Sequence, residues 1–285
     1  MRFLSLRDLI TTYVRDGQTL ALEGFTHLIP FAAAHEIIRQ GRRDLHLVRM
    51  TPDLIYDQMI GAGCARALTF SWGGNPGVGS LHRLRDAVEN GWPGPLELHE
   101  HSHAGMAAGY TAGAARLPFG MLRGYSGTDL SAVNPQVRQV TCPYTGERLA
   151  TVPALNPDVT ILHAQKADSQ GNILVVGIIG AQREAALAAR TLLVTVEELV
   201  PDLEAPMNAI VIPGFAVTAV AHVPGGAHPS YAHGYYARDN AFCRAWDEVS
   251  RKRETFLRWL DTHVRGTRDH AQFLESIQEG TAHEQ

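Results

Sequence analysis

The chain has 285 residues, of which 45% are hydrophobic and 19% charged, and its formal net charge is -4. These values are typical of a soluble globular protein with a sizeable core, and the mildly negative charge excludes a nucleic-acid footprint. Glycine, with 27 residues, exceeds the usual ~7% without forming a repeat. We therefore expect the glycines at turns and close approaches.

Three cysteines, Cys64, Cys142 and Cys243, lie far apart without paired spacing, which argues against a disulfide framework or a thiolate zinc site. The first twenty or so residues carry charges every few positions. No apolar run approaches the roughly eighteen residues that a membrane-spanning helix needs. We expect a cytoplasmic protein without a membrane partner.

Short β-rich runs alternate with helical patterns, which predicts an α/β fold with an open, mostly parallel sheet and flanking helices. In chain order we expect strand 19–22, helix 31–40, strand 45–50, helix 52–60, strand 67–70, helix 80–89 with Ser80 as N-cap, strand 96–100 and helix 103–115. After residue 150 we expect strands 159–165 and 172–176, helix 181–190, and strands 192–196, 209–212 and 217–223.

Two segments depart from this alternation. Residues 137–152 form two β-like runs around Tyr144-Thr145-Gly146, which predicts a small β-hairpin insertion. Apolar residues recur at helical spacing over about 240–265, interrupted by Arg253, which predicts one long amphipathic helix that covers the end of the sheet or meets another chain. No linker divides the sequence, so we expect residues 1–285 to form a single domain.

Two glycine-containing loops follow predicted strands, where open α/β sheets bind ligands. Amides around Gly24 and Phe25 can hold an anionic or carbonyl group, unless Gly24 only serves a tight turn. Gly74 and Gly77 precede a helix start, where free amides bind phosphate. That loop fits neither the Walker nor the dinucleotide spacing, so a flexible loop is an equal alternative.

Alternation in strand 96–100 places Leu96, Leu98 and Glu100 on one face. The leucines mark this face as buried, so we expect Glu100 to point inward at the carboxyl end of the strand, as a functional group, a helix cap or an arginine partner. Arg123 follows in a strand-like run. We expect it to pair with a carboxylate in the crevice or to lie on the surface.

The spacing of His99, His101 and His103 raises the question of a metal site, because imidazole is a common metal ligand. No acidic partner accompanies them, so we expect a solvated histidine cluster and no metal. The Gly-x-Ser-x-Gly elbow of serine hydrolases is also absent from the sequence.

Four landmarks are distinctive in combination: DGQTLALEGF at 16–25, PDVTILHAQKADSQGN at 157–172, EAALAAR with VTVEELV within 184–200, and PGGAHPS with GYY within 224–236. Together they resemble the α subunits of class I coenzyme A (CoA) transferases, most closely the A-type subunit of glutaconate CoA-transferase and its relatives. The resemblance covers about residues 5–265.

This resemblance implies a CoA-transferase-like fold and a β-type partner subunit, in an α2β2 or larger hetero-oligomer. In the family, a β-subunit glutamate attacks an acyl-CoA thioester, CoA returns to form a glutamyl thioester, and a carboxylic acid accepts the CoA. The Ser-Glu-Asn-Gly signature of that subunit is absent from this sequence. The chain is therefore expected to form one wall of the site, to be inactive alone and to carry no covalently bound cofactor.

Glu23 departs from the family signature, because it replaces the first glycine of Gly-Gly-Phe. Two other functions stay open. One related branch comprises ring-opening hydrolases of steroid-derived acyl-CoA compounds, in which a glutamate matching Glu100 is the catalytic residue. The other alternative is a non-catalytic, regulatory acyl-CoA-binding subunit, since a fold does not fix a function.

Overall fold

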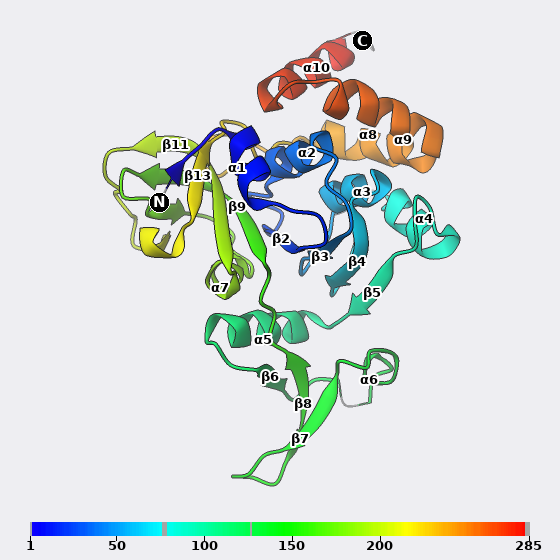
Figure 1. Cartoon of the computed structure of the whole chain (residues 1–285), viewed down its shortest axis with the longest axis vertical. Helices are drawn as coiled ribbons and strands as arrows, with labels where there is room; N and C mark the ends of the chain where they lie inside the picture. The colour runs from blue at the N-terminus through cyan, green and yellow to red at the C-terminus, as the bar shows by residue number, and fades with distance from the viewer. Residues whose placement is uncertain (1, 76–78, 126, 283–285) are drawn as a thin grey trace.

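The computed structural model describes residues 2–75, 79–125 and 127–282. Within these residues the main sheet has ten strands, and helices lie on both of its faces (Figure 1). The strands along its main path run parallel. From one edge to the other they are β1 (Arg2–Phe3), β13 (Ala219–His222), β11 (Thr191–Val200), β9 (Val159–Asp168), β2 (Thr19–Glu23), β3 (Leu45–Val48), β4 (Ala65–Phe70) and β5 (Glu97–Glu100).

Two short strands, β10 (Ile173–Val175) and β12 (Ile210–Ile212), extend this sheet beside β9 with antiparallel pairing. The predicted open, mostly parallel α/β sheet is therefore confirmed. One face is covered by α1 (Leu6–Tyr13), α2 (Phe31–Arg39), α3 (Leu54–Gly61) and α4 (His82–Asn90), and the other by α5 (His103–Ala114) and α7 (Gln182–Ala188).

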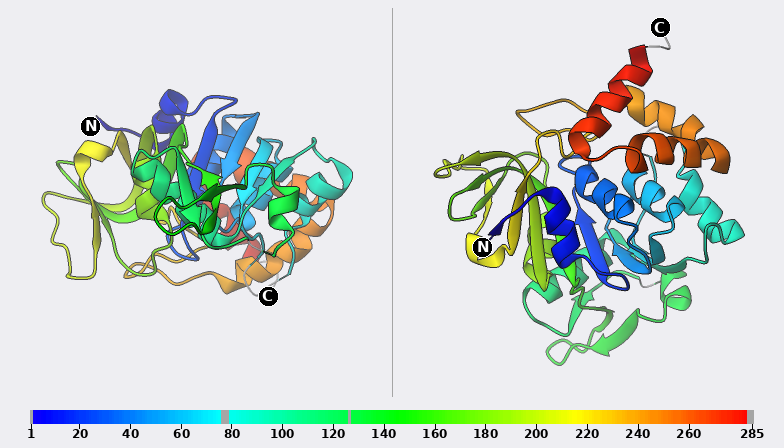
Figure 2. Two further views of the ribbon diagram at one scale, coloured as in Figure 1. Left: turned by 90° about the horizontal axis from the view of Figure 1, so that it is seen from below. Right: turned by 45° about the horizontal axis from the view of Figure 1, so that its top comes forward.

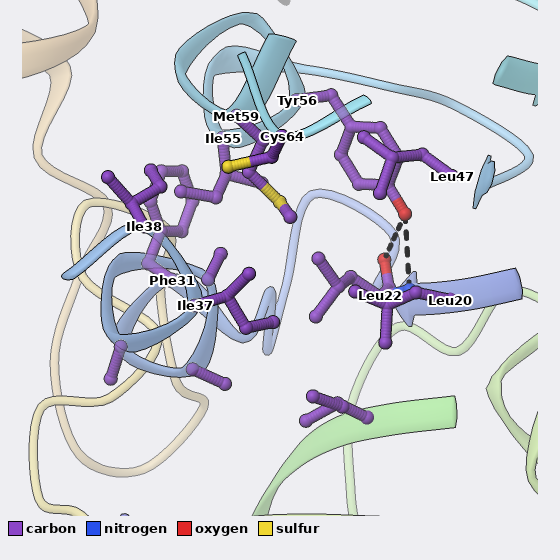
Figure 3. Close-up of a cluster of buried hydrophobic side chains, with 14 of the residues drawn as sticks. Leu20, Leu22, Phe31, Ile37, Ile38, Leu47, Ile55, Tyr56, Met59 and Cys64 are labelled. Atoms are coloured by element: carbon purple, nitrogen blue, oxygen red, sulfur yellow. Dashed lines mark hydrogen bonds between the residues drawn. The ribbon is translucent and has the colours of Figure 1, made fainter. Parts of the chain in front are cut away.

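The central strand β2 shows how the sequence builds two cores. Leu20 and Leu22 pack toward α2 and α3 (Figure 3), whereas Ala21 packs toward α5 and α7. Each fully buried leucine contributes about 1.5–3 kcal/mol. The hydroxyl of Tyr56 lies inside this apolar cluster, where it donates to the carbonyl of Val48 (2.8 Å) and accepts the amide of Leu22 (3.1 Å). Its polar atom is thus satisfied, as burial requires.

The predicted hairpin insertion is confirmed, and it has a third strand. β7 (Arg138–Thr141) and β8 (Arg148–Pro153) form the hairpin, and β6 (Phe119–Leu122) pairs with the other side of β8. A short helix, α6 (Leu130–Val133), joins β6 to β7. This small antiparallel sheet lies next to α5, at the end of the molecule opposite to the C-terminal helices (Figures 1 and 2).

The prediction of one continuous helix over about 240–265 is wrong. The segment contains α8 (Asn240–Arg251), α9 (Arg253–Trp259) and the π-helical segment η2 (Leu260–Arg265), and α10 (His270–Ala282) follows. The helix is interrupted at Lys252, whose backbone is extended (φ -111°, ψ 141°). After the break, Arg253 pairs with Asp86 of α4 (2.7 Å) and lies 5.1 Å from the centre of the Trp92 ring. The apolar stripe packs in the same core cluster as α2 and α3.

Ser80 is not the N-cap of α4, in contrast to the prediction. The helix begins later, at His82, and its first amides are capped by another helix. The carboxylate of Asp57 in α3 accepts the amides of Arg83 and Leu84, both at 2.8 Å, and the indole N–H of Trp246 at 3.0 Å. Burial raises the pKa of Asp57 to about 6, although these hydrogen bonds act in the opposite direction.

No helix in the described part of the chain has the length and apolar character needed to cross a membrane.

Candidate functional site

The carboxyl ends of β2 and β9 form the switch point of the main sheet. After β2 the chain adds β3, β4 and β5 on one side, and after β9 it adds β11 and β13 on the other side. Connections that leave neighbouring parallel strands in opposite directions open a crevice, and open α/β sheets bind ligands there. The candidate site is therefore the rim that loop 24–30 forms with the segments packed against it.

Loop 24–30 folds back over its first residue. A Cβ on Gly24 would lie 2.8 Å from the carbonyl oxygen of Leu28 and 2.9 Å from that of His27, so the close approach requires glycine. Thr26 and Leu28 have positive φ values of 57° and 53°. Such conformations cost roughly 1–3 kcal/mol each and persist only where the surroundings impose them.

Residues 224–236, here called the strap, supply those surroundings. The carbonyl oxygen of Tyr231 accepts the amide of Leu28 (3.0 Å), and the hydroxyl of Ser230 accepts the amide of Ile29 (3.2 Å). These bonds join segments that lie about two hundred residues apart in sequence. The strap therefore holds the strained loop at the switch point.

His27 connects the loop to two further segments. Its Nε2 accepts the amide of His233 (3.0 Å), so its Nδ1 carries the proton and donates to the carbonyl of Ile178 (3.1 Å). Burial lowers the pKa of His27, against the effect of the Ile178 carbonyl. Phe25 packs so tightly beside Gly180 that a Cβ there would lie 2.9 Å from the Phe25 Cβ. Because its Nε2 accepts a hydrogen bond and its Nδ1 donates one, His27 is a neutral imidazole that joins these segments.

Glu23, the last residue of β2, is only 3% exposed. Its Oε1 accepts the hydroxyl of Tyr110 from α5 (2.8 Å) and the amide of Met50 (3.1 Å). Burial raises the pKa of Glu23, and the charge of Arg49 and these hydrogen bonds act in the opposite direction. The carboxyl group that replaces the family glycine is therefore used to join β2, the end of β3 and α5.

Arg49, just after β3, is fully buried. Its guanidinium donates to the carbonyl of Gly24 (2.8 Å) and to both carboxylate oxygens of Asp53 (2.9 and 3.1 Å). Burial raises the pKa of Asp53, and the charge of Arg49 opposes this. A bidentate buried pair of this kind fixes geometry, so loop 24–30 is held from the β3 side as well.

The strap is anchored by Glu197 of β11. Its Oε1 accepts the imidazole Nε2 of His163 (2.6 Å) and the hydroxyl of Tyr236 (2.5 Å), and its Oε2 accepts the amide of Gly225 (2.8 Å). Burial alone would raise the pKa of Glu197, but the bonds from His163, Tyr236 and Gly225 outweigh it and lower the pKa. Strap, β9 and β11 thus meet at one buried carboxylate.

Glu100 does not point inward, in contrast to the prediction. β5 is the edge strand of the main sheet, Glu100 is exposed, and Leu98 on the same face is 39% exposed. Leu96, on the predicted inward face, does pack against the core of α2 and α3, but Leu98 and Glu100 further along the edge strand are exposed. The Glu100 carbonyl accepts the side-chain amide of Asn134 (2.7 Å).

The other predicted site residues lie in different places. Arg123 is not in the crevice: its side chain is 79% exposed and pairs with Glu147 of the insertion at 2.8 Å. The ring of Trp72 leaves no room for a side chain at Gly74, because a Cβ there would lie 2.5 Å from that ring. Gly77 lies outside the described residues.

Two of the three histidines near β5, His99 and His101, are more buried than predicted, whereas His103 is exposed as predicted. His101 is 3% exposed and its Nδ1 lies 3.1 Å from the hydroxyl of Tyr125. The ring of His99 lies beside that of His46, tilted by 42° with the ring centres 5.4 Å apart. Within the described part of the chain, no group of three or more histidine, cysteine, aspartate or glutamate side chains could hold a metal ion.

Three residues of the rim, Arg49, Tyr110 and Glu197, were not predicted as site residues. Arg49 and Glu197 carried a usable signal, because each is a charged residue directly after an apolar run, toward the end of a parallel strand where the sheet opens. Tyr110 carried none, since only the packing of α5 brings it to Glu23.

An open α/β sheet with a strapped loop at its switch point defines the class of fold, and comparisons with known proteins identify the family. The model of the coenzyme A transferase family matches residues 3–222. The A-type subunit of 3-oxoadipate CoA-transferase from Pseudomonas knackmussii is 65% identical over 277 residues, which cover 97% of this chain and 98% of that protein.

More distant relatives also match over most of both chains. The A-type subunit of glutaconate CoA-transferase from Acidaminococcus fermentans is 32% identical over 97% of this chain and 92% of its own length. The crystal structure of that enzyme matches with a TM-score of 0.91, covering 97% of this chain and 93% of that chain at 31% identity. One component of the cholesterol ring-cleaving hydrolase of Mycobacterium tuberculosis is 30% identical over 89% and 90% of the two chains. The chain belongs to the coenzyme A transferase family, as the sequence landmarks implied.

Proposed function

We propose that this chain is the A-type subunit of a heteromeric 3-oxoadipate CoA-transferase, in which CoA passes from an acyl-CoA to 3-oxoadipate. The observation that carries the proposal is the 65% identity to the Pseudomonas knackmussii protein, which extends over nearly the whole of both chains. On this proposal residues 1–285 act as one domain, and a β-type subunit completes an α2β2 or larger assembly.

The described rim supports a role as one wall of a shared active site. Its buried carboxylates, Glu23, Asp53 and Glu197, are each engaged by two or more hydrogen-bond donors. A carboxylate held in this way is a poor nucleophile toward a thioester. The glutamate that takes up the acyl group and then CoA is therefore expected on the β-type partner, as in the family.

The loops of this chain would position the substrates. Loop 24–30, with Gly24 and Phe25, is prearranged by the strap and by Arg49, so its backbone can meet a thioester carbonyl or a carboxylate without further ordering. Gly74 lies in a second loop, after β4, at the same end of the sheet, and Gly74 and Gly77 are proposed to contact CoA. No covalently bound cofactor is needed for this chemistry, and a cytoplasmic location fits the three unpaired cysteines.

Co-expression with a β-type CoA-transferase subunit from the same genome tests the proposal. The purified pair is incubated with 3-oxoadipate and acetyl-CoA, succinyl-CoA or glutaryl-CoA, and 3-oxoadipyl-CoA is measured by mass spectrometry. We expect its formation by the pair and none by this chain alone. Failure with every donor, in a stable complex, would contradict the proposal.

The two alternatives receive less support. A ring-opening hydrolase would use Glu100 as a general base, and the hydrolase component is also a relative, but at 30% identity. In this chain Glu100 is an exposed residue of the edge strand β5, whereas the rim lies at β2 and β9. Acyl-CoA binding by the isolated chain, together with a lack of exchange activity in any complex, would instead favour the non-catalytic binding subunit.

A further inference from the structure

A cavity of about 380 Å³ lies where α2 and α3 end and where β3 and β4 begin. This is the end of the main sheet opposite to the rim. Ile38 and Cys64, both labelled in Figure 3, belong to its apolar part. Four of its lining residues are arginines, Arg39, Arg42, Arg43 and Arg265, and none of the described lining residues is acidic.

Arginines near helix ends often serve to cap C-terminal carbonyl groups. Backbone amides already do so at this place. The amide of Gly41 donates to the carbonyl of Ile38 in α2, and the amide of Cys64 donates to that of Met59 in α3, both at 3.0 Å. Among the described hydrogen bonds, none of the four guanidinium groups donates to a carbonyl of α2 or α3. Arg39 instead donates to the carbonyl of Val264 in η2 (2.9 Å). Helix capping therefore explains Arg39, but among the described hydrogen bonds it explains neither Arg42 nor Arg43.

The charges around the cavity are only partly balanced. Two of the arginines pair with carboxylates of their own helices, Arg39 with Glu36 at 3.0 Å and Arg265 with Asp261 at 2.8 Å. Within the described residues, Arg42 and Arg43 have no carboxylate within ion-pair distance, and Nε of Arg42 is buried without a hydrogen-bond partner. Like charges gathered at one cavity repel, and an unsatisfied buried donor costs about 1–3 kcal/mol.

We propose that this cavity binds the phosphate groups of a small diphosphate-bearing compound, which balance the charges of Arg42 and Arg43. The planar guanidinium group matches the oxygens of a phosphate, and the volume lies in the range of small-molecule sites. Ile38 and Cys64 provide apolar contact for the rest of the ligand. The inference concerns a second site and does not depend on the proposed transferase activity.

Isothermal titration of the purified complex with pyrophosphate tests the site, with inorganic phosphate and ADP titrated in parallel. We expect saturable binding of pyrophosphate that weakens with added salt. ADP binding of similar or greater strength would identify a nucleotide ligand, whereas weaker ADP binding would identify a smaller diphosphate. The double substitution Arg42→Gln/Arg43→Gln should weaken binding at least about tenfold, as expected for lost charge-assisted hydrogen bonds.

A matched pair of single substitutions controls for the loss of an arginine. Arg265→Gln and Arg85→Gln each remove an ion pair between residues four positions apart, but only Arg265 lines the cavity. Arg265→Gln should weaken pyrophosphate binding and Arg85→Gln should not, with unchanged melting temperatures in the absence of ligand. No saturable binding by the wild-type complex, or equal effects of the two substitutions, would overturn the proposal.

Discussion

Removing the charge of Glu197 should loosen the strap. Glu197→Gln keeps the shape of the side chain but loses the carboxylate that meets His163, Tyr236 and the amide of Gly225 at 2.5–2.8 Å. Breaking a buried, hydrogen-bonded charge typically costs about 3–5 kcal/mol. Because the strap holds the loop at the switch point, we also expect kcat/KM for CoA exchange to fall by about ten- to a hundredfold.

Glu198→Gln is the matched control. Glu198 is the next residue, and its side chain is 47% exposed. Its contacts, the ion pair with Lys166 and the hydrogen bond from the hydroxyl of Tyr235 in the strap (2.9 Å), lie at the surface, so their loss should cost no more than about 1 kcal/mol. Urea unfolding of the complex at a fixed protein concentration measures both variants. Equal free energies of unfolding for the two variants, within about 0.5 kcal/mol, would refute the anchoring role.

The pH dependence gives an independent check. A carboxyl group whose pKa is lowered by folding stabilises the protein above its unfolded pKa of about 4.3, and this contribution is lost as the pH falls through the lower, folded pKa. The pKa of Glu197 is lowered in this way. The difference in unfolding free energy between wild type and Glu197→Gln should therefore shrink as the pH falls below about 4. A difference that stays constant would contradict the reasoning.

Three further predictions concern other parts of the chain. Glu100→Gln should retain near-full CoA-exchange activity, and so should the control Glu97→Gln, which changes another exposed glutamate of β5. Loss of activity in Glu100→Gln alone would favour the hydrolase-type role. Gly24→Ala should destabilise the complex by about 1–3 kcal/mol through overpacking. Gly94→Ala is the control and should be neutral, because a Cβ at Gly94 meets open space. Equal melting temperatures of the two variants in calorimetry would show that the tight packing at Gly24 does not contribute to stability. Burial raises the pKa of Asp57 to about 6, so its charged form costs free energy above that pH. The unfolding free energy of wild type relative to Asp57→Asn should therefore rise by about 2–3 kcal/mol from pH 7 to pH 4. Urea unfolding measures this difference, and a difference that does not change with pH would argue against the prediction.

The parts of the fold that depend on local pattern could be predicted from sequence. Residues 20–22 of β2 and 192–196 of β11 are buried and mostly apolar, which is typical of central parallel strands. The break at Lys252 could not be predicted, because the ion pair that follows it joins Arg253 to Asp86, 167 residues away. The periodic pattern continues across the break, so it contains no signal for it.

The candidate site was predicted less completely, because it also depends on contacts between residues far apart in the sequence. Alternation correctly placed Glu100 and Leu98 on one face, but whether that face is covered depends on the order of strands in the sheet, which puts β5 at the edge. Glu23 was recognised as a departure from the family signature. Its partner Tyr110 could not be, since the contact requires α5 to pack across β2.

The central claim is that this chain forms a wall of the active site while its partner supplies the nucleophile. Incubating the complex with an acyl-CoA and then with borohydride reduces a glutamyl-CoA thioester to an alcohol, which peptide mass spectrometry locates on one of the two chains. The account predicts a reduced glutamate on the β-type partner and none in this chain. A reduced glutamate at Glu100 or Glu23 would contradict it.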